Sequence, residues 1–220
     1  MVAVALIAGG LAAVTAWRLV ARGRASAWGL ITPVTAALGT VALITGRVEL
    51  SPNVYPAIAL AAGLAAGALF YAATVSFVLV VRRWPVFERH VEEIYGQRKG
   101  LSLLPALLLA SGITAPGEEL FWRGLLQSVL AGSMGWWAAA GVTWAAYIAV
   151  NAASGSLAIL AGGIVGGMVW GGLALWTHGV LASLACHAVW TALMLGWPPG
   201  GASRAAAPSA NRAVAGSPRS

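Results

Sequence analysis

Residues 157–176 read LAILAGGIVGGMVWGGLALW, an apolar stretch that contains no charged side chain. A helix needs about 20 mostly apolar residues to cross the core of a bilayer, so this stretch predicts a transmembrane helix. Its glycines repeat at intervals of four residues: Gly162, Gly163, Gly166, Gly167, Gly171 and Gly172. Because small residues at this interval let helix backbones approach closely in lipid, we expect this helix to be tightly surrounded by others. Gly63 and Gly67 predict a similar close approach for an earlier helix.

The composition of the whole chain is that of an integral membrane protein. Of its 220 residues, 60% are hydrophobic and only 9% are charged, whereas a soluble domain carries about 25% charged residues. The net charge is +7, but the basic residues lie in short stretches between apolar runs or in the C-terminal tail. This distribution indicates topology signals and argues against a nucleic-acid partner. The single cysteine, Cys186, excludes an internal disulfide.

Further apolar windows predict more crossings, so we expect an all-α, polytopic transmembrane helix bundle of about seven spans, with roughly six to eight compatible with the sequence. The windows are residues 2–16, 28–45, 54–81, 101–130, 134–150, 157–176 and 180–197. The fourth window is too long for one simple crossing, and Pro116 and Gly117 in its middle predict a kink. The first helix is expected to be retained, because its arginines follow the apolar run, whereas a signal peptide carries basic residues before it.

Three basic segments predict the orientation. They are the arginines between Arg18 and Arg24, the polar loop 82–100 and the tail 198–220. Because basic loops stay in the cytoplasm, seven crossings with the N-terminus outside and the tail inside satisfy all three. The loop 82–100 has an amphipathic middle that predicts a helix lying in the membrane interface. The overall composition is typical of a high-GC bacterium, so we expect a multi-pass protein of a bacterial plasma membrane.

Two adjacent carboxylates lie within the fourth apolar window. Glu118 and Glu119 are followed by Arg123, one helical turn after Glu119. Ionisable side chains at membrane depth are costly, so they are candidates for function. On a helix Glu119 and Arg123 share one face and can pair. Glu118 is rotated from Glu119 by about 100°, so it can point into a different cavity and stay available for proton transfer. The alternative is a Glu–Arg pair that only joins helices, with the second Glu near the interface.

Two further polar pairs lie in later apolar windows. Tyr147 and Asn151 are four residues apart near the end of the fifth window, and His187 and Thr191 are four apart in the seventh. Histidine can act as a general base, a metal ligand or a proton donor. An isolated Asn or His in a membrane helix can also be only a hydrogen-bonding group between helices. Both interpretations stay open for Asn151.

The residues Glu118-Glu119-Leu-Phe-Trp-Arg123-Gly124 resemble the EExxxR signature of the CAAX-protease and bacteriocin-processing (CPBP) family of intramembrane proteases. This family includes the type II CAAX prenyl endopeptidases and the Abi-type bacterial proteins. Its later motifs are an aromatic residue with His four positions on, and a His with Asn or Asp four positions on. In the same order, this chain has the pairs Tyr147-x-x-x-Asn151 and His187-x-x-x-Thr191.

The resemblance covers roughly residues 101–197 and, together with the apolar windows and the composition, it divides the chain into three parts. Residues 1–100 would be N-terminal transmembrane helices with a basic cytoplasmic loop at 82–100. Residues 101–197 would be catalytic core helices similar to those of the family. Residues 198–220, rich in Ala, Ser, Pro, Gly and Arg, predict a disordered basic tail.

The resemblance also implies roles for six catalytic residues: Glu118, Glu119, Arg123, Asn151, His187 and Thr191. Glu118 would activate a water that attacks the scissile carbonyl, supported by Glu119 and Arg123. Asn151, at a position where the family has His, and His187 would orient the water or stabilise the oxyanion. Thr191 stands where the family has Asn or Asp and keeps a hydroxyl. A catalytic zinc usually has three protein ligands, and Glu118 with His187 supplies fewer, so the sequence leaves metal and other cofactors open.

The function that the resemblance implies is an intramembrane endopeptidase, a metalloendopeptidase or a glutamate-type protease. Its partners would be the lipid bilayer and a membrane-associated or prenylated peptide or protein substrate. One alternative is a catalytically impaired relative that binds a membrane peptide or partner, for example in bacteriocin immunity. Another is a small transporter with a proton path through the buried Glu, His and Arg side chains. A transporter predicts a broken helix in each half, and the break at Pro116 and Gly117 has no clear counterpart.

Overall fold

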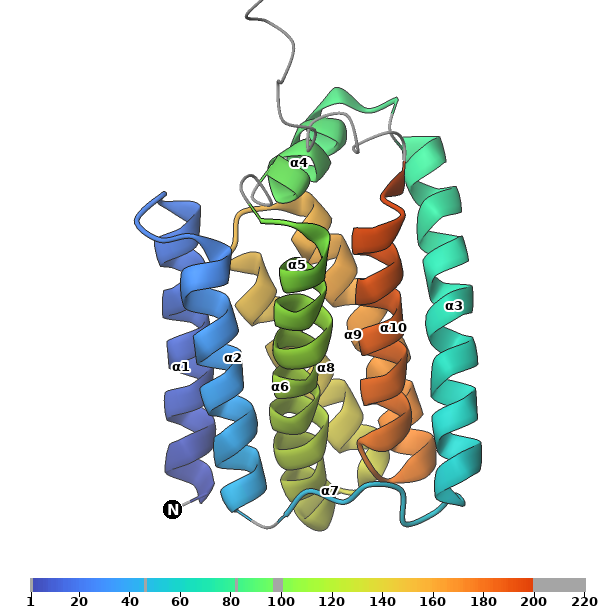
Figure 1. The fold of residues 1–220 in the computed structure, drawn as a ribbon. Coiled ribbons are helices and arrows are strands. Elements are labelled where there is room, and N and C mark those ends of the chain that lie inside the picture. The colour runs from blue at the N-terminus through green and yellow to red at the C-terminus, as the bar shows by residue number, and fades with distance from the viewer. Residues whose placement is uncertain (1, 46, 82, 97–100, 200–220) are drawn as a thin grey trace, which may run out of the picture.

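The computed structural model describes residues 2–45, 47–81, 83–96 and 101–199, and the regular structure in these ranges is all helical (Figure 1). The α-helices and the two π-helical segments are α1 (Val2–Ala21), α2 (Ala27–Ile44), α3 (Pro56–Val81), α4 (Pro85–Gly96), α5 (Leu103–Leu109), η1 (Ala110–Thr114), α6 (Ala115–Glu119), η2 (Leu120–Gln127), α7 (Ser128–Met134), α8 (Trp136–Ala152), α9 (Leu157–Thr177) and α10 (Leu181–Gly196). The expected all-α class is confirmed.

The long helices have the length and surface of membrane helices. By length and composition, α1, α2, α3 and α9 can each cross a membrane, and α10 is a shorter apolar helix. Large apolar side chains on their outer faces are exposed, including Ile7 at 65%, Leu69 at 71% and Met168 at 58%. So much exposed apolar surface is typical of a protein that faces lipid. The number of seven crossings stays a prediction.

The first helix extends beyond its apolar window. The window covers about residues 2–16, and α1 continues to Ala21 and carries Arg18 in its last turn. The physical reason is that a long basic side chain near the end of a membrane helix can extend its charged group to the interface. An arginine at this position therefore does not end the helix.

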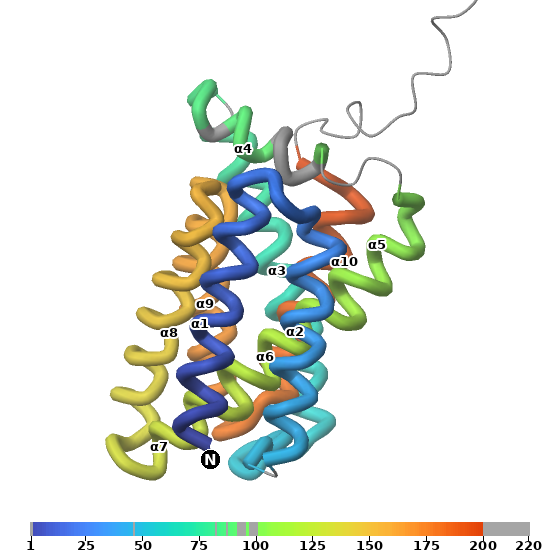
Figure 2. The backbone as a smooth tube through the Cα atoms, turned by 90° about the vertical axis from the view of Figure 1, so that its left-hand side faces the viewer, coloured from blue at the N-terminus to red at the C-terminus, as the bar shows by residue number. Residues whose placement is uncertain are grey.

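The long fourth window forms one unbroken helical path from Leu103 to Met134, which crosses the bundle obliquely (Figure 2). Pro116 lies in the first turn of α6, where its ring and missing N–H disturb the preceding helical turn. π-Helical segments lie on both sides of α6, η1 before it and η2 after it, and the kink expected at Pro116 and Gly117 stays a prediction. Such π segments within α-helices are frequent at functional sites.

The N-terminal helices pack on two different sides of this path. Figure 1 shows α1 and α2 together on one side and α3 on the other, next to α10. α2 crosses α6 so closely that a Cβ at Gly117 would collide with the backbone of Thr35. A Cβ at Gly39 would in turn lie 2.9 Å from the Cα of Gly117. This glycine contact brings α2 next to the two glutamates.

The glycine pair of α3 packs against α10, as the spacing predicts. A Cβ at Gly63 would collide with the backbone of Ala182. A Cβ at Gly67 would lie 2.7 Å from the carbonyl oxygen of Cys186. Neither position can hold a larger residue without moving one helix away from the other.

Some glycines of α9 face other helices and some face open space. Cβ atoms at Gly163 and Gly167 would touch side chains of α8, and one at Gly171 would lie 3.9 Å from Oε1 of Gln127 in η2, whereas those at Gly162 and Gly172 would meet no atom within 4 Å. The expectation that this helix is surrounded is therefore correct for the faces toward α8 and η2 and wrong for the face that carries Gly162 and Gly172. The physical reason is that glycines at intervals of four residues occupy more than one stripe of the helix.

The connection between α1 and α2, helix α4 and the C-terminal end of α10 lie at the same end of the bundle (Figure 1). The amphipathic helix predicted within 82–100 is present as α4, and the Leu157 N–H at the start of α9 donates to Nδ1 of its His90 over 2.8 Å. At the opposite end, the backbone N–H of Val180 donates to Glu49 O. Residues 82 and 97–100 of the predicted loop, and 200–220 of the predicted tail, lie outside the described residues.

Substitution of Gly67 tests the close contact between α3 and α10. We expect Gly67→Ala to lower the free energy of unfolding in detergent by about 1–3 kcal/mol, because the added methyl overpacks the contact. The matched control is Gly172→Ala, since a Cβ there meets open space and alanine favours a helix. Thermal unfolding followed by circular dichroism measures both. Equal effects of the two substitutions would contradict the packing described here.

Candidate active site

The centre of the site is an ion pair buried between the helices. Nη1 of Arg123 lies 3.0 Å from Oε1 of Glu119, and both side chains are fully buried. Glu119 ends α6 and Arg123 lies in η2, one turn later. Nη2 of Arg123 also donates to the carbonyl oxygen of Gly167 in α9 over 3.2 Å. The pairing predicted from the spacing is confirmed, and the pair connects the oblique helix to α9.

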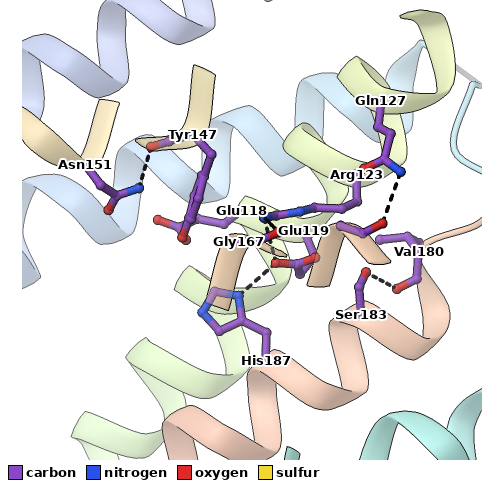
Figure 3. Close-up of polar contacts among 11 residues, drawn as sticks. Glu118, Glu119, Arg123, Gln127, Tyr147, Asn151, Gly167, Val180, Ser183 and His187 are labelled. Carbon is purple, nitrogen blue, oxygen red and sulfur yellow. Dashed lines mark hydrogen bonds and ion pairs between the residues drawn. The ribbon is translucent and has the colours of Figure 1, made fainter. Parts of the chain in front are cut away.

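His187 joins this pair from α10. Its Nδ1 lies 2.9 Å from Oε1 of Glu119 (Figure 3). The imidazole ring stacks on the indole of Trp170, with ring centroids 3.7 Å apart and an angle of 15° between the planes. Glu119 therefore binds both Arg123 and His187 through one oxygen, and α6, η2 and α10 meet at this carboxylate.

Glu118 points away from this network. Its Oε2 accepts a hydrogen bond of 2.6 Å from the phenol of Tyr147 in α8 (Figure 3). Glu118 and Tyr147 line a small pocket whose other wall comes from α1 and α2, including Trp17 and Leu38. The space in this pocket is on the scale of a single water molecule. The expectation that Glu118 and Glu119 have different surroundings is thus confirmed.

The structure places Asn151 at the pocket but Thr191 outside the hydrogen-bonded group. Asn151 lines the pocket with Glu118. Its amide Nδ2 donates to the carbonyl oxygen of Tyr147, one turn earlier on α8, over 2.9 Å. Thr191 is half-buried on α10, and among the described residues its hydroxyl has no hydrogen bond to the other five predicted residues. Asn151 is therefore a group of the pocket wall, whereas Thr191 gains no role from this geometry.

Arg123 also contacts the aromatic side chains around the site. Its guanidinium carbon lies 4.5 Å from the ring centroid of Tyr147 and 5.5 Å from that of Trp170. A guanidinium over aromatic faces is stabilised by the ring quadrupole, and more strongly where water is excluded. Arg123 thus contacts the aromatic groups next to both carboxylates, Tyr147 beside Glu118 and Trp170 beside His187.

Sequence reasoning missed Gln127 and Trp170. Gln127 is fully buried, and its Nε2 donates to the carbonyl oxygen of Gly171 over 3.3 Å. Arg123 and Gln127 are four residues apart, as are the two glycines whose carbonyls they bind, Gly167 and Gly171. An amide four residues after Arg123 in an apolar window was a signal for Gln127. Nothing in the sequence separated Trp170 from the other tryptophans.

Several buried polar atoms around the ion pair lack a hydrogen-bond partner. They are Oε2 of Glu119, Nε of Arg123 and Oε1 of Gln127. A buried polar atom without a partner costs about 1–3 kcal/mol. Each such group in a native structure calls for an explanation, and a catalytic role is one explanation that fits a site with two carboxylates.

The described residues do not form a three-ligand zinc site. No group of three or more His, Cys, Asp or Glu side chains within the described ranges is placed to hold a metal ion. His187 uses Nδ1 for Glu119, and Glu118 binds Tyr147. Since catalytic zinc usually has three protein ligands, no step of the mechanism below is assigned to a metal.

These features define a class of protein: a helical membrane protein with a polar, carboxylate-containing site enclosed by its helices. The family model described as type II CAAX prenyl endopeptidase Rce1-like matches residues 100–193. This match confirms the resemblance seen in the motifs and, at the level of the family, supports a CAAX-protease-like membrane endopeptidase. No curated protein and no solved structure matches the chain.

Removal of Arg123 tests the buried pair. We expect Arg123→Met to lower the free energy of unfolding by about 3–5 kcal/mol, because Glu119 would be left as an uncompensated buried charge. The double variant Glu119→Gln/Arg123→Met should lose less, since it removes both charges. Arg22→Met, at an exposed position, is the control and should change stability by less than about 0.5 kcal/mol. Denaturation in mixed micelles measures all three. A double variant less stable than Arg123→Met would contradict this account of the pair.

Proposed function

We propose that this protein is an intramembrane endopeptidase in which Glu118 is the general base that activates water. The observation that carries the proposal is the different position of the two adjacent carboxylates. Glu119 binds Arg123 and His187, whereas Glu118 lies in a pocket and accepts one hydrogen bond from Tyr147. A carboxylate that is bound to an arginine is a poor base, so Glu118 is the better candidate for proton transfer.

The arrangement supports hydrolysis of a peptide bond by a water held next to Glu118. Glu118 would remove a proton from this water as the water attacks the scissile carbonyl carbon. A base must lie within hydrogen-bonding distance of the proton that it takes, and the pocket at Glu118 has space of that scale. Glu119, Arg123 and His187 would fix the helices around the pocket and keep a positive charge near the developing oxyanion.

The apolar lining next to Glu118 supports the proposal that the substrate is membrane-associated or prenylated. Apart from Glu118, Tyr147 and Asn151, most of its lining is apolar, and α1 and α2 supply much of it, including Ala13 and Ile31. An apolar wall removes water from the reacting groups, which strengthens the electrostatic interactions there. We infer that residues 101–197 supply the catalytic groups and that part of 1–100 supplies the wall.

The arrangement of the helix ends supports the proposed orientation. The connection between α1 and α2, helix α4 and the end of α10 share one end of the bundle (Figure 1). With the predicted basic loops in the cytoplasm, that end would be the cytoplasmic one and the N-terminus would lie outside. A bacterial plasma membrane is the proposed location.

Cleavage in liposomes tests the proposal. The probe is a farnesylated peptide with a CAAX terminus, carrying a fluorophore and a quencher on opposite sides of the scissile bond. We expect the wild type to cleave it and Glu118→Gln to lower kcat by at least about 1,000-fold, because an amide cannot take the proton from water. The matched control is Glu88→Gln, which changes an exposed glutamate on α4 and should leave kcat unchanged. Turnover that survives in Glu118→Gln would exclude Glu118 as the base.

A further inference from the structure

The phenol of Tyr147 lies in the pocket next to Glu118. Its O–H donates to Oε2 of Glu118 over 2.6 Å, a short distance that is typical of a hydrogen bond to a carboxylate. Among the described residues it is the one side chain with a hydrogen bond to Glu118. Tyr147 and Glu118 also line the same pocket. The hydroxyl is therefore next to the position where the water and the scissile carbonyl would meet.

The ring of Tyr147 is held firmly by its neighbours. Its side chain is 4% exposed. It makes edge-to-face contacts with Trp122 and Trp170, with ring centroids 5.6 Å and 6.2 Å away. The guanidinium of Arg123 lies over its face at 4.5 Å. These contacts fix the ring but leave the O–H free to rotate about the C–O bond, and a phenylalanine would fill the same space without the hydroxyl.

Asn151 is less well placed to donate a hydrogen bond in the pocket. Its Nδ2 already donates to the carbonyl oxygen of Tyr147. Its Cβ and amide carbon lie against α9, where a Cβ at Gly163 would be 3.1 Å and 3.3 Å away. The amide is therefore held against the backbone of its own helix and against α9. The hydroxyl of Tyr147, by contrast, reaches the reacting carboxylate.

We propose that Tyr147 is a further catalytic residue, whose O–H binds Glu118 in the resting site and the oxyanion of the substrate during hydrolysis. This inference rests on the proposed function. A reacting atom must lie about 3 Å from both the base and the oxyanion donor. The hydroxyl of Tyr147 lies 2.6 Å from Glu118. A carbonyl that is attacked by a water on Glu118 would therefore lie close enough to accept a hydrogen bond from this hydroxyl.

The movement of negative charge during hydrolysis explains why the hydroxyl of Tyr147 would change its hydrogen-bond partner. Glu118 takes a proton from water as the water oxygen bonds to the carbonyl carbon, and the π electrons of the C=O bond move to its oxygen. The negative charge thus passes from Glu118 to the substrate oxygen, and the O–H of Tyr147 follows it. The C–N bond then breaks, the oxyanion re-forms the carbonyl, and the proton on Glu118 passes to the leaving nitrogen. Water and the peptide bond yield a carboxylic acid and an amine.

The test is Tyr147→Phe in the full chain, in liposomes, with the same farnesylated fluorogenic peptide. We expect kcat to fall by about 100-fold or more, as when a donor to an oxyanion is removed, while KM changes by less than about threefold. Tyr71→Phe is the matched control, because it removes a phenol that donates to the Trp197 carbonyl oxygen in an exposed contact. It should leave kcat and KM unchanged. Circular dichroism and thermal unfolding of each variant show whether the fold is kept.

The outcomes separate this inference from the proposed function. If the wild type cleaves, Glu118→Gln does not and Tyr147→Phe keeps kcat within about twofold, the role of Tyr147 is overturned and the role of Glu118 stands. A rise in KM at unchanged kcat would also overturn it, since it would show a contact to bound substrate rather than to the oxyanion. If the wild type does not cleave the peptide, both the proposed function and this inference fail. A fall in kcat alone supports both.

Discussion

The buried ion pair of Glu119 and Arg123 determines how the oblique helix packs against α9 and α10. In lipid, two charges need each other and further hydrogen bonds, because no water is present to solvate them. Here Arg123 donates a hydrogen bond to the carbonyl oxygen of Gly167, and Glu119 forms a hydrogen bond with His187. Arg123 can reach a backbone carbonyl of another helix because glycine leaves that part of α9 without side chains. The glycine pattern of α9 and the charge pair of the oblique helix thus belong to one arrangement, which Gln127 extends by one turn to Gly171.

The ion pair also explains how two neighbouring glutamates come to differ. Glu119 is neutralised by Arg123, so in the proposed mechanism Glu118 is the carboxylate that is left to act on a substrate. The helix around them is π-helical before and after α6, and this wider winding sets the directions in which Glu118 and Arg123 leave the backbone. Tyr147 contacts both parts, since its ring lies under the guanidinium of Arg123 and its hydroxyl binds Glu118. Tyr147 therefore links the position of Glu118 to that of the Glu119–Arg123 ion pair.

The sequence predicted what depends on local spacing, and the remainder required the three-dimensional arrangement. Apolar length predicted the helices, and the interval of four residues predicted both the Glu119–Arg123 pair and the contact of Gly63 and Gly67 with another helix. The partner of His187 could not be predicted, because it depends on how α10 is rotated against α6. The hydrogen bond from Tyr147 to Glu118 could not be predicted either, because it joins residues of two helices that are 29 positions apart in sequence. Asn151 was expected to donate in the pocket, but a backbone carbonyl of its own helix is the nearer partner.

The residues of the family motifs form only part of the pocket at Glu118. The motif residues lie within 100–193, the part of the chain that the Rce1-like family model matches. Much of the apolar wall opposite Glu118 comes instead from α1 and α2, which lie outside that range. α2 reaches this position because Gly39 and Gly117 let the two helices cross without intervening side chains, and α1 then packs on α2. In the proposed function, chemistry and substrate contact would thus fall to different parts of the chain: the core helices position Glu118 and Tyr147, and the first two helices supply much of the wall in front of them.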